Sequence, residues 1–211
     1  MSPRIFLLSP ASCHGERAQL VFNPQAQFPL ARALRTREGV PLGDVFSFLS
    51  GLYFRGKLTY ARAFERPPAG VPGTVVITTA DGLVSPHARV NLRRLARWAA
   101  VPIDAFEKRY CRPLLRDAEL IRDAAAPDCE VVLLGSIATG KYVDLLLRVF
   151  GERLLFPSSF VGRGDMSRGG LLLRAVDAGR ELDYAPVATS VRHGARPPRL
   201  QPRRRPRPAA G

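Results

Sequence analysis

Short apolar runs alternate with segments of helical periodicity along the chain. Runs rich in Val, Ile and Leu, with the length of buried strands, lie at residues 5–8, 74–79, 131–134 and 153–156. Segments with helical spacing of apolar residues lie at 16–22, 31–37, 45–49, 58–64, 89–100, 113–126, 143–150 and 171–178. Because strands that alternate with helices favour parallel pairing, the pattern predicts a single compact mixed α/β domain with a central, largely parallel sheet.

Three details refine this prediction. Asp44 is expected to cap the helix at 45–49, and residues 51–57 are expected to separate that helix from the next. The glycine-rich segment 160–170 is predicted to be a turn that opens the helix at 171–178. Residues 181–187 are expected to add an edge strand to the sheet.

The C-terminal end differs in composition from the rest of the chain. Seven arginines lie within residues 192–211, so half of the net charge of +14 is concentrated there and half belongs to the body. We therefore predict an α/β domain at 1–188 and a disordered Arg/Pro-rich tail at 189–211. The surplus of positive charge favours nucleic acid or another polyanion as partner, although a GC-rich genome, which enriches proteins in Arg, Ala and Pro, would give the same surplus.

Several classes of protein are disfavoured by the sequence. The chain has no apolar run long enough for a membrane span, and its N-terminal apolar run is too short for a signal peptide. The cysteines, Cys13, Cys111 and Cys129, are odd in number and lack C-x-x-C spacing, which argues against a zinc site or a disulfide scaffold. We therefore expect a cytoplasmic protein without metal or cofactor.

The segment 130–142 has the pattern of a strand, a glycine-bracketed turn and a helix. Free amides at a helix N-terminus attract anions, and the spacing from Gly135 to Gly140-Lys141 matches the start of a phosphate-binding loop. Tyr142 stands where such a loop needs Ser or Thr for magnesium, which disfavours a nucleotide hydrolase. An anion site and a purely structural turn remain as the two interpretations. The candidate anion-binding residues of this segment are Gly135, Ser136, Thr139, Gly140, Lys141 and Tyr142.

Turns after the first two strands offer further candidates. Ser9 follows the run at 5–8, and Asp81 follows the run at 74–79, where a parallel sheet places its ligands. Asp81 is either a catalytic or substrate-orienting acid or a turn-forming residue. Cys13, beside Ser12 and His14, is predicted to belong to turn structure, because adjacent residues seldom act together as nucleophile and base.

Two basic segments complete the set of candidates. Aromatic and cationic residues interleave at 53–62, where rings could stack on bases and cations meet phosphates, or where a core helix pair could present a charged face. The glycine-rich turn at 160–170 could hold a second phosphate. The candidates from these segments are Tyr53, Arg55, Lys57, Arg163 and Arg168.

Short motifs in the right order make the chain resemble the YaaA family of peroxide-resistance proteins and a related bacterial domain family of unknown function. In chain order, the motifs are Leu8-Ser9-Pro10-Ala11, Leu49-Ser50-Gly51-Leu52-Tyr53, Phe54-x-Gly56-x-x-x-Tyr60, Gly82-Leu83-x-x-Pro86, the strand–turn–helix segment at 131–142 and Arg168-Gly169. In that family the L-S-G-L-Y motif runs directly into G-L-L-x-P, whereas here the two are far apart. The resemblance implies a mixed α/β domain with a positively charged cleft that binds DNA and protects against oxidative damage.

Three hypotheses follow. The first is a nucleic-acid-binding protein, with DNA a better partner than RNA, whose cleft is formed by the turns at 9–15, 81–86 and 135–142. The second is an enzyme of the N-glycosidase or transferase type that acts on a nucleobase or nucleotide through Asp81. The third is a protein-interaction domain with a tail that adheres to RNA.

Overall fold

A six-stranded, mostly parallel sheet forms the centre of the protein. The computed structural model describes residues 2–201. Across the sheet, the strands follow the order β4-β3-β1-β6-β7-β8. Their bounds are Leu83–Val84, Thr74–Ile77, Arg4–Leu8, Glu130–Leu134, Leu154–Pro157 and Tyr184–Pro186. The inner strands β3, β1, β6 and β7 are parallel, and the two edge strands are antiparallel to their neighbours. This confirms the predicted fold class.

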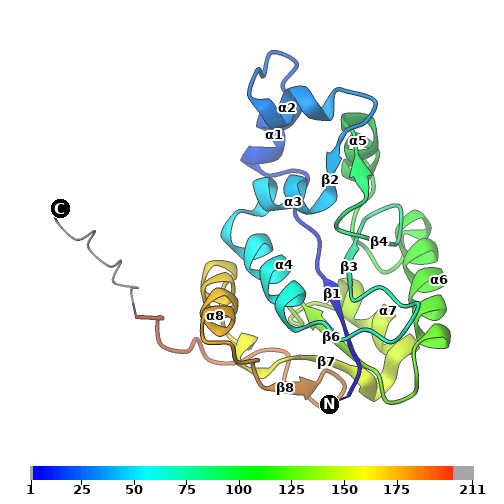
Figure 1. Ribbon diagram of the computed structural model, residues 1–211, viewed down its shortest axis with the longest axis vertical. Helices are drawn as coiled ribbons and strands as arrows, with labels where there is room; N and C mark the ends of the chain where they lie inside the picture. Colours follow the sequence, from blue (N-terminus) through cyan, green and yellow to red (C-terminus); the bar gives the residue numbers. More distant parts are fainter. Residues whose placement is uncertain (1, 202–211) are drawn as a thin grey trace.

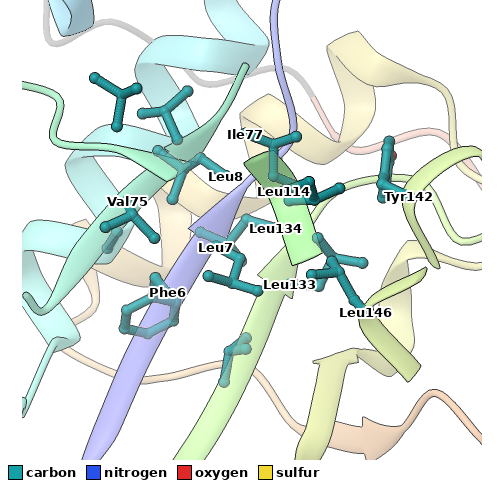
Figure 2. Packing of buried hydrophobic residues seen from close by; sticks show 14 of the residues in the cluster. Phe6, Leu7, Leu8, Val75, Ile77, Leu114, Leu133, Leu134, Tyr142 and Leu146 are labelled. Carbon is teal, nitrogen blue, oxygen red and sulfur yellow. The ribbon is translucent and has the colours of Figure 1, made fainter. Parts of the chain in front are cut away.

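Helices cover both faces of this sheet. The helices α4 (Leu52–Phe64) and α8 (Asp165–Asp177) lie on one side, and α6 (Lys108–Ala124) and α7 (Gly140–Phe150) lie on the other (Figure 1). Burial from both faces explains why β1 is apolar at every position from Ile5 to Leu8, each of which is fully buried. Figure 2 shows Phe6, Leu7 and Leu8 between the side chains of β3 and β6.

A smaller layer of helices lies beyond the C-terminal end of β1 (Figure 1). It contains α1 (Glu16–Phe22), α2 (Pro29–Leu34), α3 (Leu42–Ser50) and α5 (Leu92–Ala99). The two-residue strands β2 (Val40–Pro41) and β5 (Arg89–Val90) pair antiparallel within it. These elements therefore overhang the sheet edge at which β1, β3 and β6 end.

The structure corrects the predicted starts of four helices. Gly51, at φ 61°, joins α3 directly to α4, so residues 52–57 are helical instead of forming a break. Helix α8 begins at Asp165, inside the predicted turn, and α6 begins at Lys108 with Pro113 in its interior. Residues 89–90 form β5, after which Asn91 caps α5 by accepting a hydrogen bond from the Arg94 amide at 3.0 Å.

Two 3₁₀ turns lie beside β7, and the start of α3 differs from the prediction. Residues Gly151–Arg153 and Ser158–Phe160 form 3₁₀ turns on either side of β7. Asp44 lies in the first turn of α3, but Pro41 occupies the N-cap position, so the predicted cap was wrong. An acidic residue still stabilises this end of the helix through the helix dipole.

Residues 190–201 form no helix or strand, but they lie against the body. Arg192 donates to the Asp144 carboxylate at 2.6 Å, and the side chain of Leu200 reaches Gly170 of α8. The predicted tail from residue 189 is described only to residue 201, and its last part, 202–211, lies outside the described residues. Within residues 2–201, no helix is long and apolar enough to cross a membrane.

Candidate functional site

A cavity of about 590 Å³ lies at the C-terminal edge of the parallel strands. Three of its lining residues directly follow or lie near the ends of central strands: Ser9 after β1, Thr79 after β3 and Ser136 after β6. Ligands of open α/β sheets bind at this edge, because the connecting loops diverge there and leave a crevice. The cavity size falls within the usual range for small-molecule sites, roughly 300–1,000 Å³.

The predicted anion-binding turn forms one wall of this cavity. Ser136 and Lys141 line it, and Lys141 is solvent-exposed in the first turn of α7. Thr139 is the N-cap residue, and its side chain makes no capping hydrogen bond. Partial positive charge at the helix N-terminus and the ammonium of Lys141 therefore act on the same wall.

Tyr142 closes the turn instead of binding a metal ion. Its hydroxyl donates to the backbone carbonyl of Ser136 at 2.8 Å, and its ring is buried. A side chain at Gly135 would place its Cβ 2.9 Å from both the Ser9 Cβ and the Tyr142 hydroxyl oxygen. Gly135 is therefore required for the close approach of the β1 and β6 ends. Gly135, Thr139 and Gly140 are not among the residues that line the cavity.

Lys57, which the sequence suggests as a cation for phosphates, is buried beside the cavity. It lies on α4 with only 1% of its surface exposed, and its Nζ donates to the Ser9 carbonyl at 2.6 Å and contacts the Ser9 Oγ at 2.8 Å. The rings of Tyr53 and Phe54 lie 4.5 and 4.9 Å from the same nitrogen. Burial lowers the pKa of Lys57 to about 7, an effect that the nearby Asp165 opposes and Arg168 reinforces.

Arg168 and Asp165, from the start of α8, form a layer next to Tyr53. The Arg168 Nε donates to the Phe160 carbonyl at 3.2 Å, and its guanidinium lies 3.3 Å from the Asp165 carboxylate. Arg168 is buried, so it is held by acceptors of the protein, and it is absent from the cavity lining. Asp165 does line the cavity. The sequence predicts a phosphate contact at Arg168 and makes no prediction for Asp165.

Two buried polar groups lie beside the cavity. Among the described residues, the Trp98 Nε1 has no hydrogen-bond acceptor, and the Tyr53 hydroxyl lies next to the Arg168 side chain; both residues line the cavity. The Thr79 hydroxyl donates to the Trp98 carbonyl at 2.6 Å, which ties α5 to the end of β3. Buried polar groups without partners are uncommon in native proteins, and a ligand is one way to satisfy them.

Other candidates lie away from the cavity. Arg163 donates to the Ser159 carbonyl at 3.0 Å and contacts the segment at 198, and Arg55 is exposed on α4. Asp81 accepts hydrogen bonds from Arg94 at 2.7 Å and from Arg97, and it lines a second hollow, not the cavity that contains Ser136. Two ion pairs give Asp81 a structural role in holding α5.

The second hollow is cationic and adjoins the first. It is lined by Asp81, Arg97, Lys108, Arg109 and Arg112, and Val101 lines both hollows. The two hollows therefore lie on either side of Val101, the second one over the N-terminal part of α6.

Thiol chemistry finds no support in this site. Cys13 lines the cavity, but burial raises the pKa of its thiol to about 11, so almost none of it is thiolate at neutral pH. This agrees with the prediction that Cys13 belongs to the turn. Within residues 2–201, no cluster of His, Cys, Asp or Glu has the arrangement of a metal site.

The positions of Lys57 and Tyr53 could have been found from the sequence. With a helix beginning at Leu52, Tyr53 and Lys57 are four residues apart on one face, beside Tyr60. Gly51 and Gly56 favour a turn in this segment, so the sequence does not predict the helix that gives this spacing. Trp98, in contrast, gives no sequence signal that separates a cavity wall from the core.

Comparison with known proteins adds no family assignment, since no protein-family model, no curated protein and no solved structure matches this chain.

Proposed function

We propose that the protein binds nucleic acid, DNA in preference to RNA, and that the cavity at the C-terminal edge of the sheet receives one nucleotide of it. The observation that carries this proposal is the convergence of Lys141, Ser136 and the start of α7 on one wall of a cavity of about 590 Å³. A phosphate group matches that wall in charge and in hydrogen-bonding capacity.

Neighbouring phosphates would follow the cationic surface next to the cavity. Lys108 and Arg112 line the adjoining hollow, together with Arg97 and Arg109, which also pair with Asp81 and Glu107. Single-stranded nucleic acid binds to grooves of this kind, in which cations follow the backbone.

The rings of Tyr53 and Tyr142 are not available to stack on bases, in contrast to the expectation from the sequence. Both are buried, Tyr53 between Lys57 and Phe160 and Tyr142 against Ser136, so stacking on a free ring face is not part of the proposal. Recognition would depend on phosphate contacts and on the polar edges of the cavity.

The resemblance to the YaaA family extends this proposal to a cytoplasmic protein that protects nucleic acid during oxidative stress. Burial raises the pKa values of Cys13, Cys111 and Cys129, so protection would follow from binding and not from a redox-active thiol. The alternative of an enzyme acting through Asp81 gains no support, because both oxygens of that carboxylate are engaged by arginines.

Substitution of Lys141 tests the proposal. Lys141→Ala should weaken binding of short DNA of every sequence, because a phosphate contact carries no sequence information. Fluorescence anisotropy with labelled single- and double-stranded oligonucleotides measures the dissociation constants.

The control removes the same charge elsewhere. Glu152 and Arg153 flank the far end of α7, and Arg153→Ala takes away one positive charge there. If Lys141→Ala and Arg153→Ala reduce the affinity equally, only the net charge matters and the cavity is not the binding site.

A further inference from the structure

Ser9 and Lys57 form an isolated polar pair at the bottom of the cavity. Ser9 is 6% exposed and lines the cavity, whereas Lys57 lies behind it and is absent from the lining. The Lys57 Nζ contacts the Ser9 Oγ at 2.8 Å, which is hydrogen-bonding distance. A serine hydroxyl with a buried basic nitrogen behind it is the arrangement of an activated nucleophile.

The surroundings of Lys57 favour its neutral form. No ion pair among the described residues includes Lys57, which is unusual for a buried lysine. The charged groups that act on it are Asp165 and Arg168 of α8, in opposite directions, and burial outweighs both. A substantial fraction of Lys57 is therefore an uncharged amine at neutral pH, and an uncharged amine can accept a proton.

The hydrogen bonds fit both protonation states of the pair. A neutral Lys57 donates to the Ser9 carbonyl and accepts from the Ser9 hydroxyl. A charged Lys57 donates to both Ser9 oxygens. The Ser9 hydroxyl then donates its own hydrogen to the Tyr142 hydroxyl, with which Ser9 forms a hydrogen bond. Tyr142 thereby positions Ser9 without taking part in proton transfer.

We propose that Ser9 and Lys57 are the nucleophile and general base of a hydrolase site for a carboxylic ester or amide. This activity goes beyond nucleic-acid binding. The Ser9 Oγ forms a bond to the carbonyl carbon while its proton passes to the Lys57 Nζ. The carbon–leaving-group bond then breaks, the leaving group takes that proton, and an ester of Ser9 remains. Water attacks this ester, again through Lys57, and releases the carboxylic acid and free Ser9.

The wall next to Ser9, formed by the start of α7, suits the negative charge that develops on the carbonyl oxygen. Lys141 and the first turn of α7 line the same cavity as Ser9, and preorganised positive charge of this kind stabilises an oxyanion. An acyl substrate develops only one negative charge in this step, which a single lysine and a helix N-terminus can match.

Covalent labelling with a fluorophosphonate tests the pair in the full chain. The reagent loses fluoride as its phosphorus bonds to the attacking serine oxygen, and the mass of the intact protein reports the adduct. We expect one adduct, mapped by peptide mass to Ser9, at a rate that rises with pH through about 7 as Lys57 loses its proton. Absence of an adduct on Ser9 at pH 8.5 would overturn the proposal.

Variants separate activation by Lys57 from mere exposure of a serine. Ser9→Ala should remove the adduct, and Ser85→Ala, at an exposed serine outside the cavity, should leave it in place. Lys57→Met should slow labelling about 100-fold or more, as expected for the loss of a general base. A variant with a native circular dichroism spectrum and an unchanged labelling rate would contradict the role of Lys57. If that variant does not fold, the pH profile of the unmodified chain decides the question.

Discussion

At the scale of single residues, the position of Lys57 links the fold to the candidate site. It lies on the buried face of α4 and is surrounded by two aromatic rings and the Ser9 carbonyl. Burying an ammonium group costs free energy, and hydrogen bonds and ring contacts only partly offset that cost. Because burial disfavours the charged form, the pKa of Lys57 falls to about 7, and its protonation changes near neutral pH.

Stability should therefore depend on pH through Lys57. The unfolded chain holds this proton up to about 10.5, whereas the folded chain loses it at about 7. Between these values the unfolded state binds more protons, so rising pH favours the folded state. We expect the free energy of unfolding of the unmodified protein, minus that of Lys57→Met, to increase from pH 7 to pH 9 in urea titrations.

A matched control is available on the surface. Lys108→Met removes the same kind of side chain from a position that is exposed to water in the folded protein, and is measured in parallel. A flat difference for Lys57→Met would show that Lys57 keeps its proton in the folded state.

The sequence predicts some residues of the site better than others. Ser9 and Ser136 follow strands, and Lys141 lies in the first turn of the helix after the second of them, so their place at the sheet edge could be predicted from the strand pattern. The burial of Arg168 and Lys57 could not be predicted, because a cation inside a protein contradicts the usual correlation of charge with exposure. For Lys57, only its place on the same helix face as Tyr53 could be predicted. Asp81 follows its strand as predicted, but the two arginines of α5 that engage it come from a helix whose packing the sequence does not specify.

At the scale of elements, the contact between α4 and α8 holds the site together. A Cβ on Gly56 would lie 2.8 Å from the Gly169 carbonyl oxygen, and a Cβ on Gly169 would lie 2.9 Å from the Leu52 carbonyl oxygen. The two backbones therefore meet at a pair of glycines. This contact places Lys57 and Tyr53 of α4 against Arg168 and Asp165 of α8.

Gly169→Ala should separate these helices. The added methyl group meets backbone atoms that cannot move aside, and overpacking of this kind costs about 1–3 kcal/mol. Chemical denaturation should show a loss of stability of that size. The neighbouring Gly170→Ala should be neutral or slightly stabilising, because its Cβ would meet only the end of the Leu200 side chain, at 3.3 Å. Equal effects at both positions would contradict the close contact.

The same glycines explain why helix starts were predicted wrongly. Glycine usually marks turns, and the segments 51–57 and 160–170 contain several. In the structure, Gly56, Gly169 and Gly170 lie inside helices, where they allow close packing. The strands were easier to predict, since a run of buried β-branched residues has few other interpretations.

At the scale of the whole molecule, positive charge and the C-terminal segment act together near the cavity. The Asp144 carboxylate lies against Gly140 at the start of α7, where it would repel an anion, and Arg192 pairs with it at 2.6 Å. Residues 190–201 thus neutralise an acidic group next to the proposed phosphate site. Shortening the chain within this segment would disturb that site, whereas a chain ending at Gln201 retains these contacts.

The most direct test of nucleic-acid binding is the salt dependence of DNA affinity for a chain that ends at Gln201. This chain lacks Arg203, Arg204, Arg205 and Arg207 but keeps every described residue of the cavity. Fluorescence anisotropy over a series of salt concentrations gives the slope of log affinity against log salt, about −0.9 for each phosphate contact on duplex DNA. We predict that binding persists and that Lys141→Ala makes the slope shallower by about 0.9. Loss of binding on removal of residues 202–211 would assign the affinity to the arginine-rich end and contradict a nucleic-acid site in the folded body.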